Sequence, residues 1–185
     1  MLKAILVDLD GTLIHTSEAN SLAYCQALAE FGYTVSFRKF LAVAEGKSWA
    51  TFLPELTGVT CLEQLKPIAL RKRELYGNHL SSTIMNSTLL QLLQMIRDST
   101  LIALVTTASR HAVEQLLNHH QLNDFFHLIV TGDDVIESKP HPEAYQLAAL
   151  KLGVTPSECI IFEDSVSGIK AAQLFGAQVF QVLEN

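Results

Sequence analysis

The sequence predicts an α/β fold, in which helices cover both faces of a parallel β-sheet and a helical insert follows the first strand. Short apolar runs of strand length alternate with segments that repeat apolar residues at helical spacing. Residues from about 15 to 85 interrupt this alternation with helical segments alone. The 185 residues are 49% hydrophobic and 17% charged. This composition suits one domain with a smaller second lobe and excludes a disordered chain.

Five apolar runs predict the strands of the sheet. They are Leu2–Leu9, Leu101–Val105, Leu128–Val130, Ile160–Phe162 and Val179–Leu183. Continuous apolar runs of this length are typical of strands that are covered on both faces. The connecting helices are predicted at Thr88–Arg97, Arg110–His120, Pro142–Leu152 and Ser167–Phe175, with a helical turn at Thr155–Glu158. Ser87 is the predicted N-cap of the first helix, and Pro142 lies in the first turn of the third.

The helical insert divides the predicted fold into two parts. Its four helical segments, which Gly32, Gly46 and Gly58 separate, are Glu18–Phe31, Phe37–Ala44, Trp49–Leu56 and Leu62–Tyr76. We expect residues 1–14 and 86–185 to form the α/β core and residues 15–85 to form a helical cap. The insert follows the carboxyl end of the first strand, where open parallel sheets bind ligands, so it is a candidate lid. A subdomain that only stabilises the fold explains the insert equally well.

The charge balance and the cysteines limit the classes of partner. Lys and Arg total 13 against 19 Asp and Glu, a net charge of -6. This balance argues against a nucleic-acid surface but not against a small anionic ligand. The sequence has no run of eighteen apolar residues, so we expect no membrane span. Cys25, Cys61 and Cys159 are odd in number and far apart, which predicts reduced thiols and a cytoplasmic location.

Polar residues follow four of the predicted strands at one edge of the sheet. Asp8 and Asp10 close the first strand, and the others are followed by Thr106–Thr107, Ser138–Pro140 and Glu163–Ser165. Each cluster alone has a structural explanation, such as a helix cap or a turn. Together they bring several carboxylates to one place, where the charges repel unless a cation or a shared proton intervenes. A metal ion at this edge is therefore expected.

The residue types at this edge predict phosphoryl transfer. Carboxylates without His or Cys form a hard oxygen site, which favours Mg²⁺ over zinc. Lys139 offers a point charge, and Thr106 with nearby backbone N–H groups offers hydrogen bonds, which together can hold an anion. One aspartate of the pair Asp8 and Asp10 would attack phosphorus. The other, two residues away on the same side of the strand, would protonate the departing oxygen.

The four clusters resemble, in order, the four motifs of the haloacid dehalogenase-like (HAD) superfamily. The run Val7–Ile14, together with Ser138–Pro140 and Glu163–Ser165, is similar to the branch that contains phosphoglycolate phosphatase and beta-phosphoglucomutase. The resemblance covers essentially the whole chain. It implies a Rossmann-like core with a helical cap that opens for substrate and closes to exclude bulk water.

The resemblance also implies a role for each matching residue. Asp8 would be the nucleophile that forms an aspartyl-phosphate, and Asp10 would be first the general acid and then the general base. Thr106 would bind the phosphoryl oxygens, and Lys139 would neutralise charge on Asp8 and on the phosphoryl group. The resemblance implies that Mg²⁺ is held by Asp8, Asp10 and Asp164. Glu163 would be a further ligand or a supporting partner.

Other residues are candidates for substrate selection or depart from the family pattern. Thr107 is a candidate substrate contact. Lys47 is a candidate specificity residue or simply a solvated lysine, and Arg110 either pairs with a substrate anion or begins a helix. Asn20 stands where mutase-like members of the family carry a histidine, which disfavours a mutase. His15 stands where an aspartate is common, and its role is open.

Three functions from different classes follow. The first is a Mg²⁺-dependent phosphatase that hydrolyses a small phosphorylated metabolite through an aspartyl-phosphate. The second is a sugar-phosphate mutase or phosphotransferase, in which a sugar hydroxyl accepts the phosphoryl group. The third is a non-catalytic phosphate-binding or receiver-like module, which the acceptor's position after the first strand disfavours. We expect the partner to be a small phosphorylated metabolite, neither nucleic acid nor membrane, and the protein to be a monomer or weak homodimer.

Overall fold

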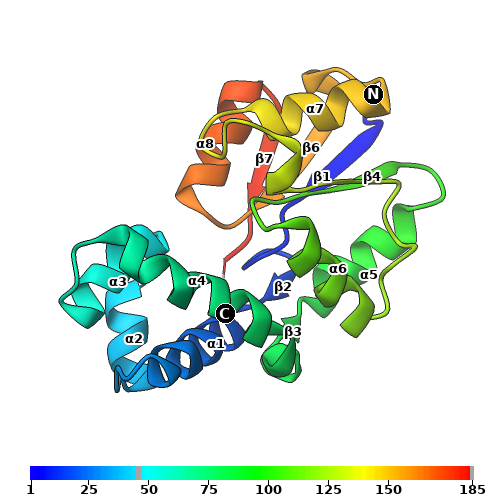
Figure 1. Cartoon of the computed structure of the whole chain (residues 1–185). Coiled ribbons are helices and arrows are strands. Elements are labelled where there is room, and N and C mark those ends of the chain that lie inside the picture. Colours follow the sequence, from blue (N-terminus) through cyan, green and yellow to red (C-terminus); the bar gives the residue numbers. More distant parts are fainter. Residues whose placement is uncertain (45–46, 184–185) are drawn as a thin grey trace. The chain divides into compact units, whose positions relative to one another are not determined.

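A computed structural model describes residues 1–44 and 47–183 of the chain (Figure 1). The chain forms two compact units, Met1–His15 with Ile84–Asn185 and Thr16–Thr83. We call them the core unit and the insert unit. The sequence-based boundaries fall after residues 14 and 85, and the structural ones after residues 15 and 83. Gly46, one of the expected helix separators, lies outside the described residues.

The core unit contains a five-stranded sheet in the order β5-β4-β1-β6-β7, and every neighbouring pair is parallel. Its strands are β1 (Ala4–Val7), β4 (Leu101–Val105), β5 (Leu128–Val130), β6 (Cys159–Glu163) and β7 (Gln178–Gln181). The predicted α/β class with a parallel sheet is therefore confirmed. The strand ends differ from the predicted ones by at most two residues.

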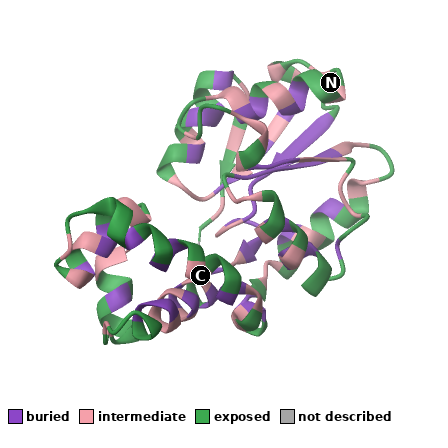
Figure 2. Cartoon of the chain, in the orientation of Figure 1, coloured by how far each residue is buried: buried purple, intermediate pink, exposed green. Residues whose placement is uncertain are grey.

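Helices cover both faces of this sheet. They are α5 (Ser87–Ile96), α6 (Arg110–His119), α7 (Glu143–Leu152) and α8 (Val166–Phe175). Figure 1 shows α7 and α8 together on one face and α5 and α6 on the other. Leu6 and Ile161 belong to an apolar cluster with Tyr145 of α7 and Phe175 of α8. Burial on both faces explains why β1 is an unbroken apolar run, all of it buried (Figure 2).

Three helices of the core unit, α5, α7 and α8, start one residue away from the predicted position. Asn86, not Ser87, is the N-cap of α5, and its side chain accepts a hydrogen bond from Leu89 N at 3.1 Å. Asn and Ser are both preferred at this position, so the preference for the residue type does not distinguish Ser87 from its neighbour. Pro142 occupies the N-cap position of α7 and does not lie within its first turn. The expected helical turn before β6 is confirmed as the 3₁₀ helix η3 (Pro156–Glu158).

Several short elements are absent from the sequence-based expectations. β2 (Ile14–His15) and β3 (Ile84–Met85) form an antiparallel pair in the core unit. His15 is therefore half of a two-residue strand. The 3₁₀ helices η1 (Gly77–Ser82) and η2 (Gly132–Asp134) are also unpredicted. Elements this short contain too few residues to show a period of two or of 3.6.

The insert unit is helical, as expected. Its helices are α1 (Ser17–Glu30), α2 (Phe37–Ala44), α3 (Trp49–Thr57) and α4 (Leu62–Tyr76). Tyr24, Phe40 and Phe52 form its aromatic core, with ring centroids 4.9 to 5.4 Å apart. Among the described residues, no helix has both the length and the apolar character needed to span a membrane.

Candidate active site

The register of the sheet brings the ends of β1 and β6 together. Val7 is paired with Phe162, and Asp8 N donates a hydrogen bond to Phe162 O at 3.0 Å. Asp8 therefore lies at the level where Glu163 ends β6, and Asp164 follows directly. Both strands end at the carboxyl edge of the sheet, which is the edge where ligands bind in folds of this class.

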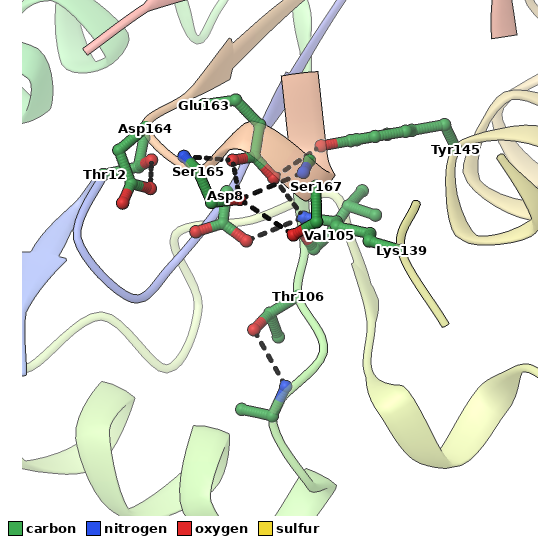
Figure 3. Close-up of polar contacts among 12 residues, drawn as sticks. Asp8, Thr12, Val105, Thr106, Lys139, Tyr145, Glu163, Asp164, Ser165 and Ser167 are labelled. Atoms are coloured by element: carbon green, nitrogen blue, oxygen red, sulfur yellow. Dashed lines mark hydrogen bonds and ion pairs between the residues drawn. The ribbon is translucent and has the colours of Figure 1, made fainter. Parts of the chain in front are cut away.

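Lys139 reaches this edge from the segment after β5 (Figure 3). Its Nζ donates hydrogen bonds to Asp8 Oδ1 at 2.7 Å, to Glu163 Oε1 at 2.5 Å and to Val105 O at 2.9 Å. Its side chain is only 3% exposed. Burial alone would lower the pKa of Lys139, but Asp8 and Glu163 outweigh that effect and hold the pKa above its usual value. Lys139 is therefore a fixed positive charge between two carboxylates.

Glu163 is fully buried, and protein donors surround its carboxylate. Oε1 accepts hydrogen bonds from Lys139 and from the Tyr145 hydroxyl, the latter at 3.0 Å. Oε2 accepts from Ser165 N at 3.2 Å and from Ser165 Oγ at 3.0 Å. Gly168 leaves the space that the carboxylate fills, because a Cβ at that position would lie 1.8 Å from Oε1. The Glu163 carboxylate is thus held on several sides.

Asp164 is held by the segment after β1. Thr12 Oγ1 donates a hydrogen bond to Asp164 Oδ1 at 2.6 Å. Gly11 adopts a φ of +88°, which is unfavourable for other residues, and a Cβ there would lie 2.3 Å from Asp164 Oδ2. The glycine therefore permits both the left-handed turn and the close approach of the carboxylate.

The environment of Asp8 weakens its acidity. Burial raises the pKa of Asp8 to about 8, and the charges of Glu163 and Asp10 act in the same direction, whereas Lys139 lowers the pKa. Burial is the largest of these effects, and together with the two neighbouring carboxylates it outweighs the stabilising charge of Lys139. A divalent cation beside Asp8 would favour its ionised form, because an opposite charge stabilises a carboxylate.

Asp8, Glu163 and Asp164 form a group that fits a metal ion. Each offers a carboxylate oxygen, and these ligand atoms lie within 4.8 Å of one another. Carboxylate oxygens are the ligands that Mg²⁺ prefers. Asp10 is not one of this group. It forms an isolated bridge with Ile14 in the turn after β1, and its Mg²⁺ contact stays a prediction.

The predicted phosphate contacts follow β4. Thr106 N donates to Val130 O at 3.0 Å, and Thr106 Oγ1 accepts from Ala108 N at 3.0 Å. A hydroxyl that accepts in this way still has a proton to donate, so the arrangement suits a phosphoryl oxygen. Thr107 is exposed. A Cβ on Gly132 would lie 2.4 Å from Thr107 O, so the segments after β4 and β5 pack closely.

Arg110 begins α6 and forms an ion pair with Asp134. Its Nη2 donates to the two carboxylate oxygens of Asp134 at 2.6 and 2.7 Å, and its backbone N donates to Asp133 Oδ2 at 2.8 Å. The Arg110 side chain is 45% exposed. This protein partner favours the structural alternative for Arg110 over a contact with substrate.

The candidates in the insert unit also have protein partners. Lys47 Nζ donates to both carboxylate oxygens of Glu55 at 2.9 Å, and the Lys47 side chain is 37% exposed. Asn20 Nδ2 donates to Thr16 Oγ1 at 3.2 Å, and Asn20 Oδ1 accepts a hydrogen bond from Lys72 Nζ. A role for Lys47 in substrate selection stays a prediction.

Tyr145 and Thr12 contact the acidic group but are not among the residues expected in the site. Thr12 belongs to the run Asp8–Thr12 that carries the first motif, so its position in the sequence could have indicated a place in the site. Tyr145 lies in an amphipathic helix among Ala and Leu residues, where an aromatic side chain is typical of the core. Its contact with Glu163 joins residues eighteen positions apart, and sequence spacing alone does not indicate it.

Known proteins share both the sequence pattern and the fold. The fructose-1-phosphate phosphatase YqaB of Escherichia coli is 28% identical over 182 residues, which cover 96% of this chain and 95% of the relative. The protein CbbY of Cereibacter sphaeroides is 30% identical over 185 residues, with coverages of 94% and 80%. The crystal structure of CbbY from Rhodobacter sphaeroides in complex with phosphate has a TM-score of 0.81 at 26% identity and covers 97% of this chain and 85% of that one.

The likeness to a more distant structure shows the fold alone. The beta-phosphoglucomutase of Clostridium difficile is 23% identical, with a TM-score of 0.78 and coverages of 100% and 86%. A family model described as haloacid dehalogenase-like hydrolase matches residues 5–182. This match spans nearly the whole chain and includes all four polar clusters at the edge of the sheet. The chain therefore belongs to the haloacid dehalogenase-like hydrolases.

Proposed function

We propose that this protein is a Mg²⁺-dependent phosphatase that hydrolyses a small phosphorylated metabolite through an aspartyl-phosphate. One observation carries the proposal. Asp8 is held by the buried Lys139 at 2.7 Å, and ligand atoms of Asp8, Glu163 and Asp164 lie within 4.8 Å of one another. A nucleophile, a fixed ammonium group and an acidic metal site in one place are what phosphoryl transfer requires.

Asp8 is the proposed nucleophile. One of its carboxylate oxygens bonds to phosphorus while the bond from phosphorus to the ester oxygen breaks, which gives an aspartyl-phosphate. Asp10 donates a proton to the departing oxygen, so the product is a neutral alcohol. Asp10 then accepts a proton from the water that attacks the aspartyl-phosphate. The second step releases inorganic phosphate and restores the Asp8 carboxylate.

Lys139 and Thr106 are the proposed stabilisers of negative charge. The three hydrogen bonds of Lys139 hold its ammonium group beside Asp8, so its position is set before the substrate arrives. Thr106 would donate its hydroxyl proton to a phosphoryl oxygen. Mg²⁺, held by Asp8, Asp164 and the Asp10 carbonyl with Glu163 as a ligand or supporting partner, would neutralise further charge on the phosphoryl group.

The names of the relatives support a phosphorylated carbohydrate as the class of substrate. YqaB is a fructose-1-phosphate phosphatase, and a relative from Thermotoga maritima, 28% identical over 182 residues, is a phosphorylated carbohydrates phosphatase. We extend this class to the present chain. A cytoplasmic location and a monomeric or weakly dimeric state stay predictions from the sequence.

The proposal is tested with p-nitrophenyl phosphate and a panel of sugar phosphates, each with and without Mg²⁺. Wild-type protein should release phosphate only with Mg²⁺, and Asp8→Asn should release none while it keeps its circular dichroism spectrum. Asp98→Asn makes the same chemical change at an exposed position and should retain full activity. Activity in Asp8→Asn equal to that of the wild type would exclude Asp8 as the nucleophile.

A sugar-phosphate mutase is the alternative. Asn20 disfavours it, because its amide already bonds Thr16 and Lys72 within the insert unit and an amide does not titrate as histidine does. Incubation with a hexose 1-phosphate separates the two reactions. A phosphatase releases inorganic phosphate, whereas a mutase forms the hexose 6-phosphate, which ³¹P NMR distinguishes.

A further inference from the structure

Tyr145 carries a polar group inside the apolar core of the core unit. Its side chain is fully buried in the cluster that α7 and α8 form against the sheet. A buried hydroxyl without a partner is costly, so its hydrogen bond determines whether the position tolerates a tyrosine. The Tyr145 hydroxyl donates to Glu163 Oε1 at 3.0 Å (Figure 3). This contact leads directly to the proposed active site.

The ring of Tyr145 makes a second contact with the same group of residues. Lys139 Nζ lies 5.0 Å from the centroid of the ring. A cation at this distance is attracted to the aromatic face, and the attraction is stronger where water is excluded. Tyr145 therefore touches both members of the buried ion pair, Glu163 through its hydroxyl and Lys139 through its ring.

The surroundings of Glu163 explain why this contact matters. Lys139 and Tyr145 share Oε1, Ser165 binds Oε2, and Gly168 lies against the carboxylate with no room for a Cβ. If the hydroxyl were absent, Oε1 would keep only its bond to Lys139. Ser165 would still hold Oε2, but Oε1 could shift with the lysine instead of holding it in place.

We propose that Tyr145 is a positioning residue, which fixes Glu163 through its hydroxyl and Lys139 through its ring and so directs the ammonium group at Asp8. The effect on catalysis rests on the proposed function, whereas the effect on Lys139 does not. A residue that only fills the core would be replaced by phenylalanine with little consequence. The hydroxyl is therefore the part of Tyr145 to test.

The first experiment compares Tyr145→Phe with wild-type protein on p-nitrophenyl phosphate at saturating Mg²⁺. Tyr145→Phe keeps the ring and loses the hydroxyl, so kcat should fall about tenfold while KM changes less than about twofold. Phe175→Leu is the matched control. Phe175 belongs to the same apolar cluster, 6.3 Å from the Tyr145 ring. Its replacement should lower Tm and leave kcat within about twofold of the wild-type value.

The second experiment observes Lys139 without a substrate. A lysine ammonium group that is buried and bound to three acceptors exchanges its protons slowly with water, so it should give a resolved ¹H–¹⁵N NMR signal. This signal is assigned by its absence from Lys139→Arg. It should broaden or disappear in Tyr145→Phe and persist in Phe175→Leu, because only the first variant removes a hydrogen bond from Glu163 Oε1.

The outcomes separate the two proposals. A wild-type protein without phosphatase activity would overturn the proposed function, and the NMR comparison would still decide the role of Tyr145. An unchanged kcat in Tyr145→Phe together with an unchanged Lys139 signal would overturn the positioning role. Loss of activity in Phe175→Leu equal to that in Tyr145→Phe would also overturn it, because core packing alone would then explain the effect.

Discussion

Two ion-pair clusters lie at the carboxyl edge of the same sheet, and they differ in burial. Lys139 is 3% exposed and bonds Asp8 and Glu163. Arg110 is 45% exposed and bonds Asp134, which also receives hydrogen bonds from Thr131. Both clusters join segments that are distant in sequence, at similar distances between charged atoms. Only the first removes its charges from water.

This difference in burial indicates different roles for the two ion-pair clusters. An exposed ion pair contributes about 0 to 1 kcal/mol to stability, because water screens it and the side chains lose freedom. In a buried cluster the charges interact more strongly, and removal of one partner leaves the others uncompensated. We infer that the Arg110 cluster joins the segments after β4 and β5, whereas the Lys139 cluster serves the reaction.

The largest expected effect comes from removal of the buried cation. Lys139→Ala should lower kcat about 10³-fold, the order expected when a fixed stabiliser of transition-state charge is lost. It should also lower Tm, because Asp8 and Glu163 then lack their common partner. Steady-state kinetics and thermal unfolding measure the two effects. Lys170→Ala, at an exposed position in α8, is the control, and a decrease of less than tenfold in Lys139→Ala would contradict the comparison.

A smaller effect is expected when Glu163 is displaced. In Gly168→Ala the new Cβ would overlap the Glu163 carboxylate, which lies 1.8 Å away, so kcat should fall about 30-fold through the shifted lysine. Gly153→Ala is the matched control, since Gly153 has a φ of +68° and no atom within 4 Å of its Cβ position. The control should lose stability through backbone strain and keep its kcat. Equal kcat values in the two variants would refute the prediction.

A substitution at Asp164 tests whether the acidic group beside Lys139 binds Mg²⁺. Asp164→Asn should raise the Mg²⁺ concentration for half-maximal activity about tenfold or more, because an amide oxygen is a weaker ligand than a carboxylate. A Mg²⁺ titration of phosphatase activity measures this change, with Asp98→Asn as the control. If the two titration curves coincide, Asp164 is not a ligand.

The smallest effect is expected in the exposed cluster. Arg110→Ala should change kcat and KM less than about twofold, and it should lower Tm by no more than a few degrees. The kinetics of p-nitrophenyl phosphate and of a sugar phosphate provide the measurement. A tenfold rise in KM for the sugar phosphate would restore the alternative in which Arg110 contacts the substrate.

Most of the core unit could be predicted from the sequence, because buried parallel strands are apolar throughout and helices show a period of 3.6. Asp8, Lys139, Glu163 and Asp164 could be expected to meet, since the carboxyl ends of parallel strands share one edge. The unpredicted part depends on contacts between distant residues. Nothing local to Tyr145 indicates Glu163.

The sequence does not predict the ion pair between Arg110 and Asp134 either. The two residues lie in different connections of the sheet, and each has an ordinary local explanation at a helix start. Charge type alone does not distinguish an arginine that meets a ligand from one that meets a neighbouring loop. Burial makes that distinction, and burial depends on the tertiary structure.

The register between β1 and β6 restricts where residues can be inserted into or deleted from this chain. Val7 lies opposite Phe162, and one residue further each strand reaches its acidic group. An insertion or deletion of one residue within either strand would turn the following side chains to the opposite face and separate the two acidic groups. The connection Gly153–Glu158 enters β6 from its far end, so a change in its length would leave the register of Asp8 and Glu163 unchanged. Homologous sequences should therefore accumulate gaps in that connection and almost none inside the two strands.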